Sequence, residues 1–246
     1  CIRDSKTGTL FQDSKVPLKK WFVAIWLDAS HKKGISSCQL ARDISVTQKT
    51  AWFMLQRIRE CFYCENNHQL EGDVELDESF VGGKNKNRHA NKKVKNSQGR
   101  SFKDKTPVLG MLERGGKVVC RVVKDTSKKS LTAPILKTIK RTATLFTDEW
   151  GGYDTVGKIY TRYIVDHSSG QYVDGDATTN SIEGFWSILK RGIIGIYHKT
   201  SRKHLHRYVN EFVFRYNTRK VSDSNRFNLL LCNTEYRITY KQLTNG

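Results

Sequence analysis

Val74-Glu-Leu-Asp-Glu-Ser-Phe-Val-Gly-Gly83 carries the clearest structural signal in the chain. Apolar and polar side chains alternate along it, and this period of two is typical of a β-strand. Gly82–Gly83 ends the strand. Asp77 lies on the polar side, so the sequence predicts a carboxylate held at a fixed position on a β-sheet.

The sequence after this strand predicts a hairpin, a helix and two more short strands. Gly115–Gly116 is a two-residue hairpin signal between two apolar runs. Leu131 and Ile135 have helical spacing, and Pro134 is expected in the first turn of that helix. The expected elements are strands at 106–113 and 117–123, a helix at 130–141, and strands at 144–148 and 160–165.

Two further helices are expected at about 180–192 and 201–219, followed by a variable tail. A β-hairpin followed by alternating strands and helices is typical of a mixed α/β domain. The N-terminal part differs, because helical periodicity there predicts helices at 18–31, 37–43 and 48–62. Thr47 is the expected N-cap of the third helix. Three helices with a tight turn before the third indicate a helix-turn-helix.

The composition favours a polyanionic partner. The chain of 246 residues has 43 Lys and Arg against 24 Asp and Glu, a formal net charge of +19. Nucleic acid is the first expected partner and acidic lipid the second. The longest apolar run, Trp21–Leu27, is too short to span a bilayer. Six scattered cysteines favour a reducing compartment, so we expect a cytoplasmic, nucleoid-associated protein.

Three acidic residues stand out as candidate metal ligands. Asp77 and Asp148 lie in or directly after predicted strands, and Glu183 lies in the first turns of a predicted helix. Carboxylates that converge from different elements can hold Mg²⁺ or Mn²⁺ for phosphoryl transfer. Asn180 and Lys190 share a helix face with Glu183. The alternative is that all of these residues are solvated surface groups.

Four blocks of the sequence resemble a known family, the DDE-superfamily insertion-sequence transposases related to the eukaryotic Merlin elements. The resemblance covers about residues 7–220. The blocks are Val74–Gly83, Leu145-Phe-Thr-Asp-Glu149, Thr179-Asn-Ser-Ile-Glu-Gly-Phe-Trp-Ser-Ile-Leu-Lys-Arg191 and Glu211-Phe-Val-Phe-Arg-Tyr-Asn-Thr-Arg219. Their order along the chain is much more specific than any single block.

This resemblance implies an RNase H-like catalytic domain that uses two Mg²⁺ ions, or Mn²⁺, to cut and join DNA. Asp77 and Asp148 match the first two metal-binding acids of the family. Asn180 and Glu183 both lie on the motif of the third, and we favour Glu183 because it is charged. Lys190 matches a lysine often found in that motif. Thr178 stands where a histidine is common in relatives.

The N-terminus is also expected to differ from relatives, which often carry a zinc ribbon before the helix-turn-helix. The chain begins with Cys1. We expect an N-terminal truncation, with residues 1–16 the remnant of a missing region; a cleaved lipoprotein is the alternative. Cys61-Phe-Tyr-Cys64 has the spacing of half a zinc site, but no second close cysteine pair exists. A pair of partly buried thiols is therefore the favoured interpretation.

Basic and polar side chains on several elements are candidate DNA contacts. Residues 84–105 form a long basic segment that follows the first metal-binding strand, and its alternative role is a solvated surface. The third N-terminal helix and the last helices carry further candidates. The candidates are Gln48, Lys49 and Arg57, then Lys92, Lys93 and Lys95, and finally Lys199, Arg202 and Lys203.

The sequence therefore predicts a DNA transposase with a helix-turn-helix domain at 17–62, an RNase H-like catalytic domain at 72–220 and a tail at 221–246. Its expected partners are the double-stranded DNA of the element ends and of the target, with a homo-oligomer assembled on the DNA. The alternative from another class is a DNA-binding regulator that has lost catalysis. A nuclease without strand transfer is the second alternative.

Overall fold

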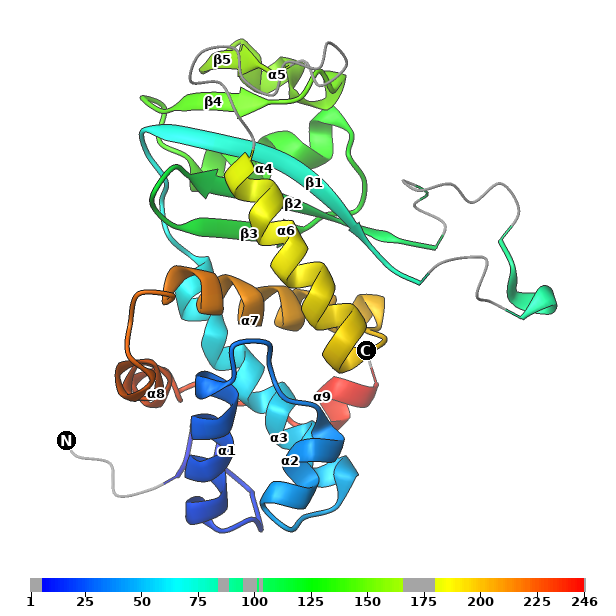
Figure 1. Cartoon of the computed structure of the whole chain (residues 1–246), viewed down its shortest axis with the longest axis vertical. Coiled ribbons are helices and arrows are strands. Elements are labelled where there is room, and N and C mark those ends of the chain that lie inside the picture. The colour runs from blue at the N-terminus through cyan, green and yellow to red at the C-terminus, as the bar shows by residue number, and fades with distance from the viewer. Residues whose placement is uncertain (1–5, 84–88, 95–100, 102–103, 166–179, 246) are drawn as a thin grey trace.

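The structure is a computed structural model that describes residues 6–83, 89–94, 101, 104–165 and 180–245. A β-sheet forms one end of the molecule in Figure 1 and the N-terminal helices form the other. Helix α7 (Leu205–Asn217) lies between them and contacts both. The short helical elements are η1 Phe62–Asn66, η3 Ala90–Lys92, η4 Gly151–Tyr153, α5 Asp154–Gly157, η5 Ile193–Tyr197 and η6 Arg202–His204.

Within the described residues, five strands form one mixed sheet in the order β3-β2-β1-β4-β5. Strands β1, β2 and β3 are antiparallel neighbours, whereas β4 and β5 run parallel to β1. The strands are β1 Asp73–Val81, β2 Thr106–Glu113, β3 Val118–Val122, β4 Thr144–Thr147 and β5 Thr161–Ile164. Each strand predicted from the sequence is confirmed within one or two residues. Gly115, at the predicted turn between β2 and β3, has a φ of 70°.

Helices cover both faces of this sheet, and the expected RNase H-like α/β architecture is confirmed. Helix α4 (Lys128–Thr138) packs on one face, where Leu131 and Ile135 meet Leu76. Helices α6 (Asn180–Gly192) and α7 cover the other face. A Cβ atom added at Gly110 of β2 would lie 2.5 Å from the ring of Trp186, so only glycine lets α6 approach this closely.

The expected position of Pro134 is wrong. Helix α4 begins one residue after its N-cap, Ser127, whose hydroxyl accepts a hydrogen bond from the Ser130 amide. Pro134 is therefore the seventh residue of the helix and lies inside it. Proline has no amide hydrogen, so the helix lacks the bond to the Ser130 carbonyl. The Ser127 cap outweighs the proline signal because it satisfies amides that would otherwise be unpaired.

The three predicted N-terminal helices are confirmed as α1 Leu18–Ser30, α2 Ser37–Asp43 and α3 Gln48–Cys61. The Thr47 hydroxyl accepts a hydrogen bond from the Thr50 amide, as expected of an N-cap. The segment predicted as a tail forms two helices, α8 Asp223–Cys232 and α9 Tyr240–Thr244. Leu230 of α8 is buried in the same apolar cluster as α1 and α3. The C-terminal segment is therefore part of the N-terminal core.

A buried cluster of charges joins these N-terminal helices to α7. The Arg59 Nε atom lies 2.8 Å from Glu211 Oε2, and Arg215 Nη2 lies 2.6 Å from Glu211 Oε1. Arg215 also donates to Asp28 of α1 at 2.9 Å. Burial and, to a smaller extent, the negative charge of Glu211 raise the pKa of Asp28 to about 6. Two cations and two carboxylates thus hold three helices together.

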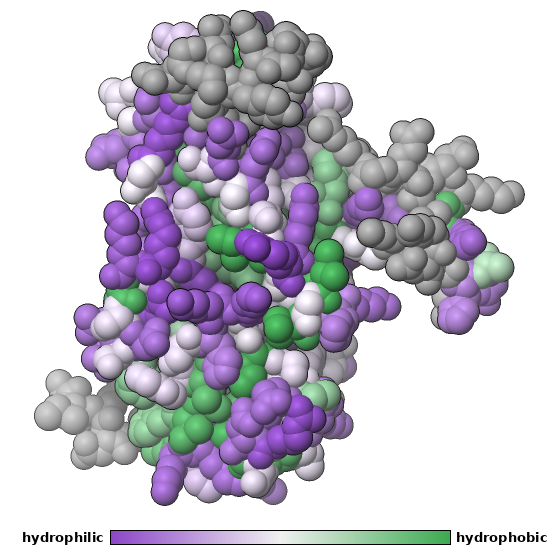
Figure 2. Space-filling view, in the orientation of Figure 1, coloured by the Kyte–Doolittle hydropathy of each residue, from purple (hydrophilic) through white to green (hydrophobic). Residues whose placement is uncertain are grey.

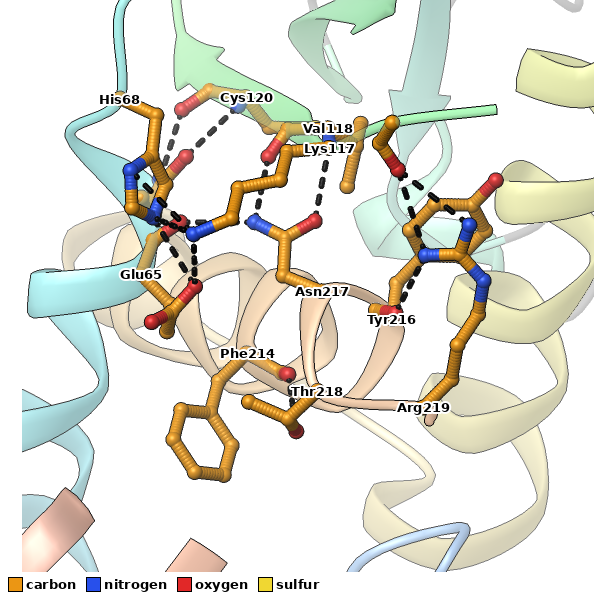
Figure 3. Close-up of polar contacts among 12 residues, drawn as sticks. Glu65, His68, Lys117, Val118, Cys120, Phe214, Tyr216, Asn217, Thr218 and Arg219 are labelled. Atoms are coloured by element: carbon orange, nitrogen blue, oxygen red, sulfur yellow. Dashed lines mark hydrogen bonds and ion pairs between the residues drawn. The ribbon is translucent and has the colours of Figure 1, made fainter. Parts of the chain in front are cut away.

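Two asparagine side chains close the outer edge of the sheet, as Figure 3 shows in part. Asn217 accepts a hydrogen bond from the Val118 amide at 2.8 Å and donates to the Val118 carbonyl at 2.9 Å. Asn66 pairs in the same way with the amide and carbonyl of Cys120, at 2.8 and 2.9 Å. Asn217 also donates to the carbonyl of Glu65. The two side-chain amides therefore satisfy backbone hydrogen-bonding groups of the edge strand β3. They also connect η1 and α7 to this strand.

Asn217→Ala is expected to lower the free energy of unfolding by about 2–4 kcal/mol, because the substitution leaves three backbone groups without their partner. Urea unfolding followed by circular dichroism measures this change. Asn225→Ala on the exposed surface of α8 is the control, and we expect it to change stability by less than about 0.5 kcal/mol. Equal effects of the two substitutions would contradict the role of Asn217.

None of the helices in the described part of the chain is long and apolar enough to cross a membrane.

Candidate active site

Asp77 and Asp148 lie close to each other because β1 and β4 are parallel neighbours in the sheet. Asp73 of β1 pairs with Thr144 of β4, and this register continues through Glu75. Asp77 is four residues beyond Asp73, and Asp148 is four residues beyond Thr144. Side chains along a strand alternate between faces, which puts Asp77 on the face that α6 covers, and Asp148 directly follows β4.

The Asp77 carboxylate is half-buried and fixed in place by two donors. Its Oδ1 atom accepts a hydrogen bond from the Glu78 amide at 2.7 Å, and its Oδ2 atom accepts one from the Trp186 indole at 2.9 Å. The pKa of Asp77 is raised to about 6, chiefly by burial, and the negative charges of Asp148 and Glu183 contribute to this rise. The negative charges of the other two predicted acids therefore act on the Asp77 carboxylate.

Asp148 begins the turn after β4, and its surroundings hold this turn in place. The Asp148 Oδ1 atom accepts a hydrogen bond from the Trp150 amide at 3.1 Å. Arg162 of β5 donates to the Asp148 carbonyl at 3.0 Å and to the Thr147 hydroxyl at 2.8 Å. The strand end and the neighbouring strand therefore position the second carboxylate.

Glu75 is a site residue that the sequence reasoning missed. It is fully buried on the same strand face as Asp77, two residues earlier. Its Oε2 atom accepts a hydrogen bond from the Ile182 amide in the first turn of α6 at 3.0 Å. A carboxylate at a helix N-terminus accepts hydrogen bonds from unpaired amides and is attracted by the positive end of the helix dipole. Glu75 thus fixes the first turn of α6, which carries Glu183. Its position two residues before Asp77, on the same strand face, is the sequence feature that could have identified it.

The glutamate after the first aspartate lies on the other face of the sheet, as the alternation of the strand predicted. Glu78 lies near the buried Tyr153. Burial raises the pKa of Tyr153 well above its usual value, and the charge of Glu78 raises it further. Glu78 is therefore separated from the Asp77 and Asp148 carboxylates by the strand itself.

The third acid lies on α6, next to the other helix candidates. Asn180, Glu183 and Lys190 are all exposed on this helix. Among the described residues, no three acidic, histidine or cysteine side chains lie close enough to coordinate one metal ion. The donor set of Asp77, Asp148 and Glu183 consists of carboxylate oxygens, which are the ligands that Mg²⁺ and Mn²⁺ prefer. A divalent cation would also offset the repulsion that raises the pKa of Asp77.

The candidate DNA contacts on α3 are divided between surface and core. Gln48 and Lys49, in the first turn of α3, are exposed. Lys49 lies over the ring of Tyr240 of α9, with its Nζ atom 5.1 Å from the ring centroid. The prediction for Arg57 is wrong, because this residue is only 3% exposed. Its guanidinium donates to the carbonyls of three residues that are distant in sequence, namely Leu10, Gln12 and Ile238.

The remaining basic candidates lie near α6 and in the segment after β1. Lys199 and Arg202 are exposed, whereas Lys203 donates to the Leu243 carbonyl of α9 at 2.6 Å. Lys92 ends η3, and Lys93 is exposed. Lys95 and Thr178 lie outside the described residues.

The two cysteine thiols near the end of α3 differ in how deeply they are buried. Cys61 is buried and Cys64 is half-buried. Burial raises the pKa of Cys61 well above its usual value and that of Cys64 to about 11. Both thiols are therefore harder to deprotonate than an exposed cysteine.

The chain is similar in sequence to a protein of a transposable element and in structure to transposase complexes. A protein of the transposable element ISH50 from Halobacterium salinarum is 29% identical over 197 residues, which are 76% of this chain and 66% of that protein. The chain thus spans slightly less than two thirds of that relative. The Mos1 transposase paired-end complex is similar at a TM-score of 0.35 and 11% identity, over 92% of this chain and 82% of that chain. The pre-cleavage Mos1 transpososome is similar at a TM-score of 0.31 and 11% identity, over 92% and 83%.

The matching family model is that of the ISXO2-like transposase domain. It matches residues 69–217, which include every strand of the sheet, both aspartates and helices α6 and α7. The match covers more than half of the chain, and the chain therefore belongs to the ISXO2-like transposase domain family.

Proposed function

We propose that the chain is a DNA transposase that cleaves the ends of an insertion sequence and joins them to target DNA. The observation that carries this proposal is the placement of Asp77 on β1, where it accepts a hydrogen bond from Trp186 of α6, beside the parallel strand β4 that Asp148 directly follows. A relationship to the Merlin elements and to the wider DDE superfamily is part of the same proposal. We also propose that the chain binds double-stranded DNA, assembles as a homo-oligomer on this DNA and associates with the nucleoid.

In this proposal Asp77, Asp148 and Glu183 hold Mg²⁺ or Mn²⁺. These ions supply charge stabilisation for the attacking and leaving oxygens of the phosphodiester. The Trp186 indole and the Glu78 amide orient the Asp77 carboxylate, and Glu75 holds the first turn of α6. Asn180 offers a neutral oxygen beside the third acid.

Both proposed reactions are in-line displacements at phosphorus. In the first, water attacks the phosphodiester at the element end, the new P–O bond forms, and the bond to the 3′-oxygen breaks. In the second, the freed 3′-hydroxyl attacks a phosphodiester of the target, and a target 3′-hydroxyl leaves. Lys190 lies two helical turns beyond Glu183 on α6, where its cation can bind a phosphate of the same strand.

The experiment that tests this proposal uses end-labelled DNA of the element termini, a target plasmid and Mg²⁺ or Mn²⁺. We expect both cleaved ends and ends joined to the plasmid. Binding without either product would instead identify a DNA-binding regulator. Cleavage without joined product would identify a nuclease.

We expect the affinity for DNA to depend steeply on salt, because the chain carries a net charge of +19. Log affinity is expected to fall with log salt by about 0.9 per neutralised phosphate. Replacing Lys92, Lys93 and Lys95 together with alanine should make this slope shallower, as measured by fluorescence anisotropy between low and high salt.

The matched control for this prediction removes the same number of charges from the α4 side of the sheet. Its substitutions are Lys129→Ala, Lys137→Ala and Lys158→Ala, at exposed positions. This control should keep the slope of the unmodified protein. A slope that the first triple variant leaves unchanged would mean that the basic segment is a solvated surface.

A further inference from the structure

Arg114, the residue that directly follows β2, is joined to the first turn of α6 by a buried carboxylate. Its Nε atom donates a hydrogen bond to Glu75 Oε1 at 3.2 Å. The other oxygen of Glu75 accepts the hydrogen bond from the Ile182 amide of α6 at 3.0 Å. Glu75 therefore connects the Arg114 guanidinium to the residue that precedes Glu183.

Arg114 is itself fixed by contacts with two neighbouring strands. Its amide donates to the Asp73 carbonyl of β1 at 2.9 Å. Its guanidinium carbon lies 3.8 Å from the centroid of the Phe146 ring of β4, and such a ring attracts a cation. The Phe146 ring also stacks on Tyr163 of β5, with 5.5 Å between the ring centroids. The guanidinium is thus held in place relative to the two strands that lead to the candidate metal site.

Helix α6 depends on contacts at its inner side for its placement on the sheet. Figure 2 shows hydrophilic residues over much of the outer surface of this side of the molecule. At the inner side, the Ile182 amide donates to Glu75 and the Trp186 indole donates to Asp77. Amides in the first turn of a helix have no acceptor within the helix. Glu75 is therefore the acceptor that fixes where α6 begins, and Arg114 fixes Glu75.

We propose that Arg114 is a positioning residue of the metal site: through Glu75 it holds the first turn of α6 and so keeps Glu183 near Asp77. This inference rests on the proposed function, because it assumes that Asp77 and Glu183 share a metal ion. Groups that hydrogen-bond around a metal site orient its ligands, and loss of one typically lowers metal affinity by about 10- to 100-fold.

The sign of the effect separates positioning from simple electrostatics. Arg114 is a cation, and a cation near the site repels Mn²⁺. Removal of this charge alone would therefore strengthen Mn²⁺ binding. Loss of positioning has the opposite effect, because Glu183 is then no longer held near Asp77. Weaker Mn²⁺ binding after the loss of a nearby cation is thus specific to the positioning role.

The test combines two measurements on Arg114→Met. The first is hydrogen–deuterium exchange of the chain without DNA or metal, read by mass spectrometry on a peptide that contains Ile182. Exchange in the first turn of α6 should become about 10-fold faster, because Glu75 loses its charged partner. The second is the affinity for Mn²⁺ in the complex with uncleaved element ends, measured by electron paramagnetic resonance. We expect this affinity to fall by about 10- to 100-fold.

A double-mutant cycle with Glu75→Gln tests whether Arg114 acts through Glu75. Glu75→Gln keeps the shape of the side chain and removes the charge that pairs with Arg114 and attracts the N-terminus of α6. The double variant should bind Mn²⁺ about as weakly as either single variant, because both substitutions break the same connection. Losses that multiply in the double variant would overturn this route.

Arg121→Met is the matched control, because Arg121 is also half-buried on the sheet but donates to the Asn66 carbonyl of η1, at 2.6 Å. This control should leave both measurements unchanged, and circular dichroism checks that each variant is folded. Arg114→Lys is the second variant, because it keeps the cation and disturbs the fold less. Both measurements should shift in the same direction by a smaller factor, up to about 10-fold, since an ammonium lacks the planar group that stacks on Phe146.

Unchanged exchange and unchanged Mn²⁺ affinity in the Arg114 variants that fold would overturn the proposal, and so would stronger Mn²⁺ binding. Equal losses in Arg121→Met would also overturn it, because the effect would then be a general loosening of the sheet. Failure of the proposed function is a different result, since it shows in the unmodified protein as element ends that are neither cleaved nor joined. An unmodified complex without bound Mn²⁺ would overturn both proposals.

Discussion

Asp77→Asn and Asp148→Asn are each expected to lower end cleavage by at least about 1,000-fold, because loss of a metal-binding carboxylate removes several kcal/mol of transition-state stabilisation. An amide keeps the shape of the side chain and loses the negative charge that holds Mg²⁺. Asp77 lies on β1 against Trp186 of α6, and Asp148 directly follows the neighbouring parallel strand β4. Affinity for the element ends should change little, since neither residue lies among the proposed phosphate contacts.

The measurement compares cleavage rates and DNA affinities of the two variants with those of the unmodified protein. Asp73→Asn is the matched control, because Asp73 is an exposed aspartate on the same strand. This control should retain nearly full activity. Substantial cleavage by either site variant in Mg²⁺ would contradict the assignment of that aspartate.

Glu211→Gln is expected to lower the free energy of unfolding by about 3–5 kcal/mol, because it leaves two buried arginines without their shared counter-charge. Glu211 is fully buried and contacts both Arg59 and Arg215. Burial alone would raise the pKa of Glu211, but the two arginines outweigh burial and hold this pKa below its usual value. The stabilisation is therefore present above the ordinary glutamate pKa and is lost as the pH falls through the lower folded value.

Urea unfolding at pH 7 and at decreasing pH tests this prediction. The control is Glu71→Gln, because Glu71 pairs with Lys140 at the surface, where both side chains are about half exposed. Exposed ion pairs contribute less than about 1 kcal/mol, so the control should be nearly neutral. Similar costs for Glu211→Gln and Glu71→Gln would contradict a structural role for the buried cluster.

Local patterns predicted most of the elements that make up this fold. The alternation along β1, the Gly115 turn and the Thr47 cap depend on residues close in sequence, and each is confirmed. Helices α8 and α9 were missed, although Ser222 and Thr239 each accept the N-cap hydrogen bond that begins a helix. These helices are short, and α8 gains its stability from packing on α1, which local propensity does not report.

The site depends on contacts between segments that are distant in sequence. The sequence identified Asp77 and Asp148, but the register between β1 and β4 follows from packing of the whole sheet. Arg57 was predicted as a DNA contact because it is a basic residue on the third N-terminal helix. The carbonyls that hold it come from residues 10, 12 and 238, which no helical period reveals. Whether Glu183 or Asn180 is the third ligand stays a prediction.

The most direct test of the central claim is electron paramagnetic resonance of Mn²⁺ in the complex of the protein with uncleaved element ends. We expect protein-bound Mn²⁺ in the unmodified complex and its loss in both Asp77→Asn and Asp148→Asn, with the DNA still bound. Asp73→Asn should keep the bound ion. Equal Mn²⁺ binding by the unmodified protein and by both aspartate variants would contradict the claim that these two carboxylates form the metal site.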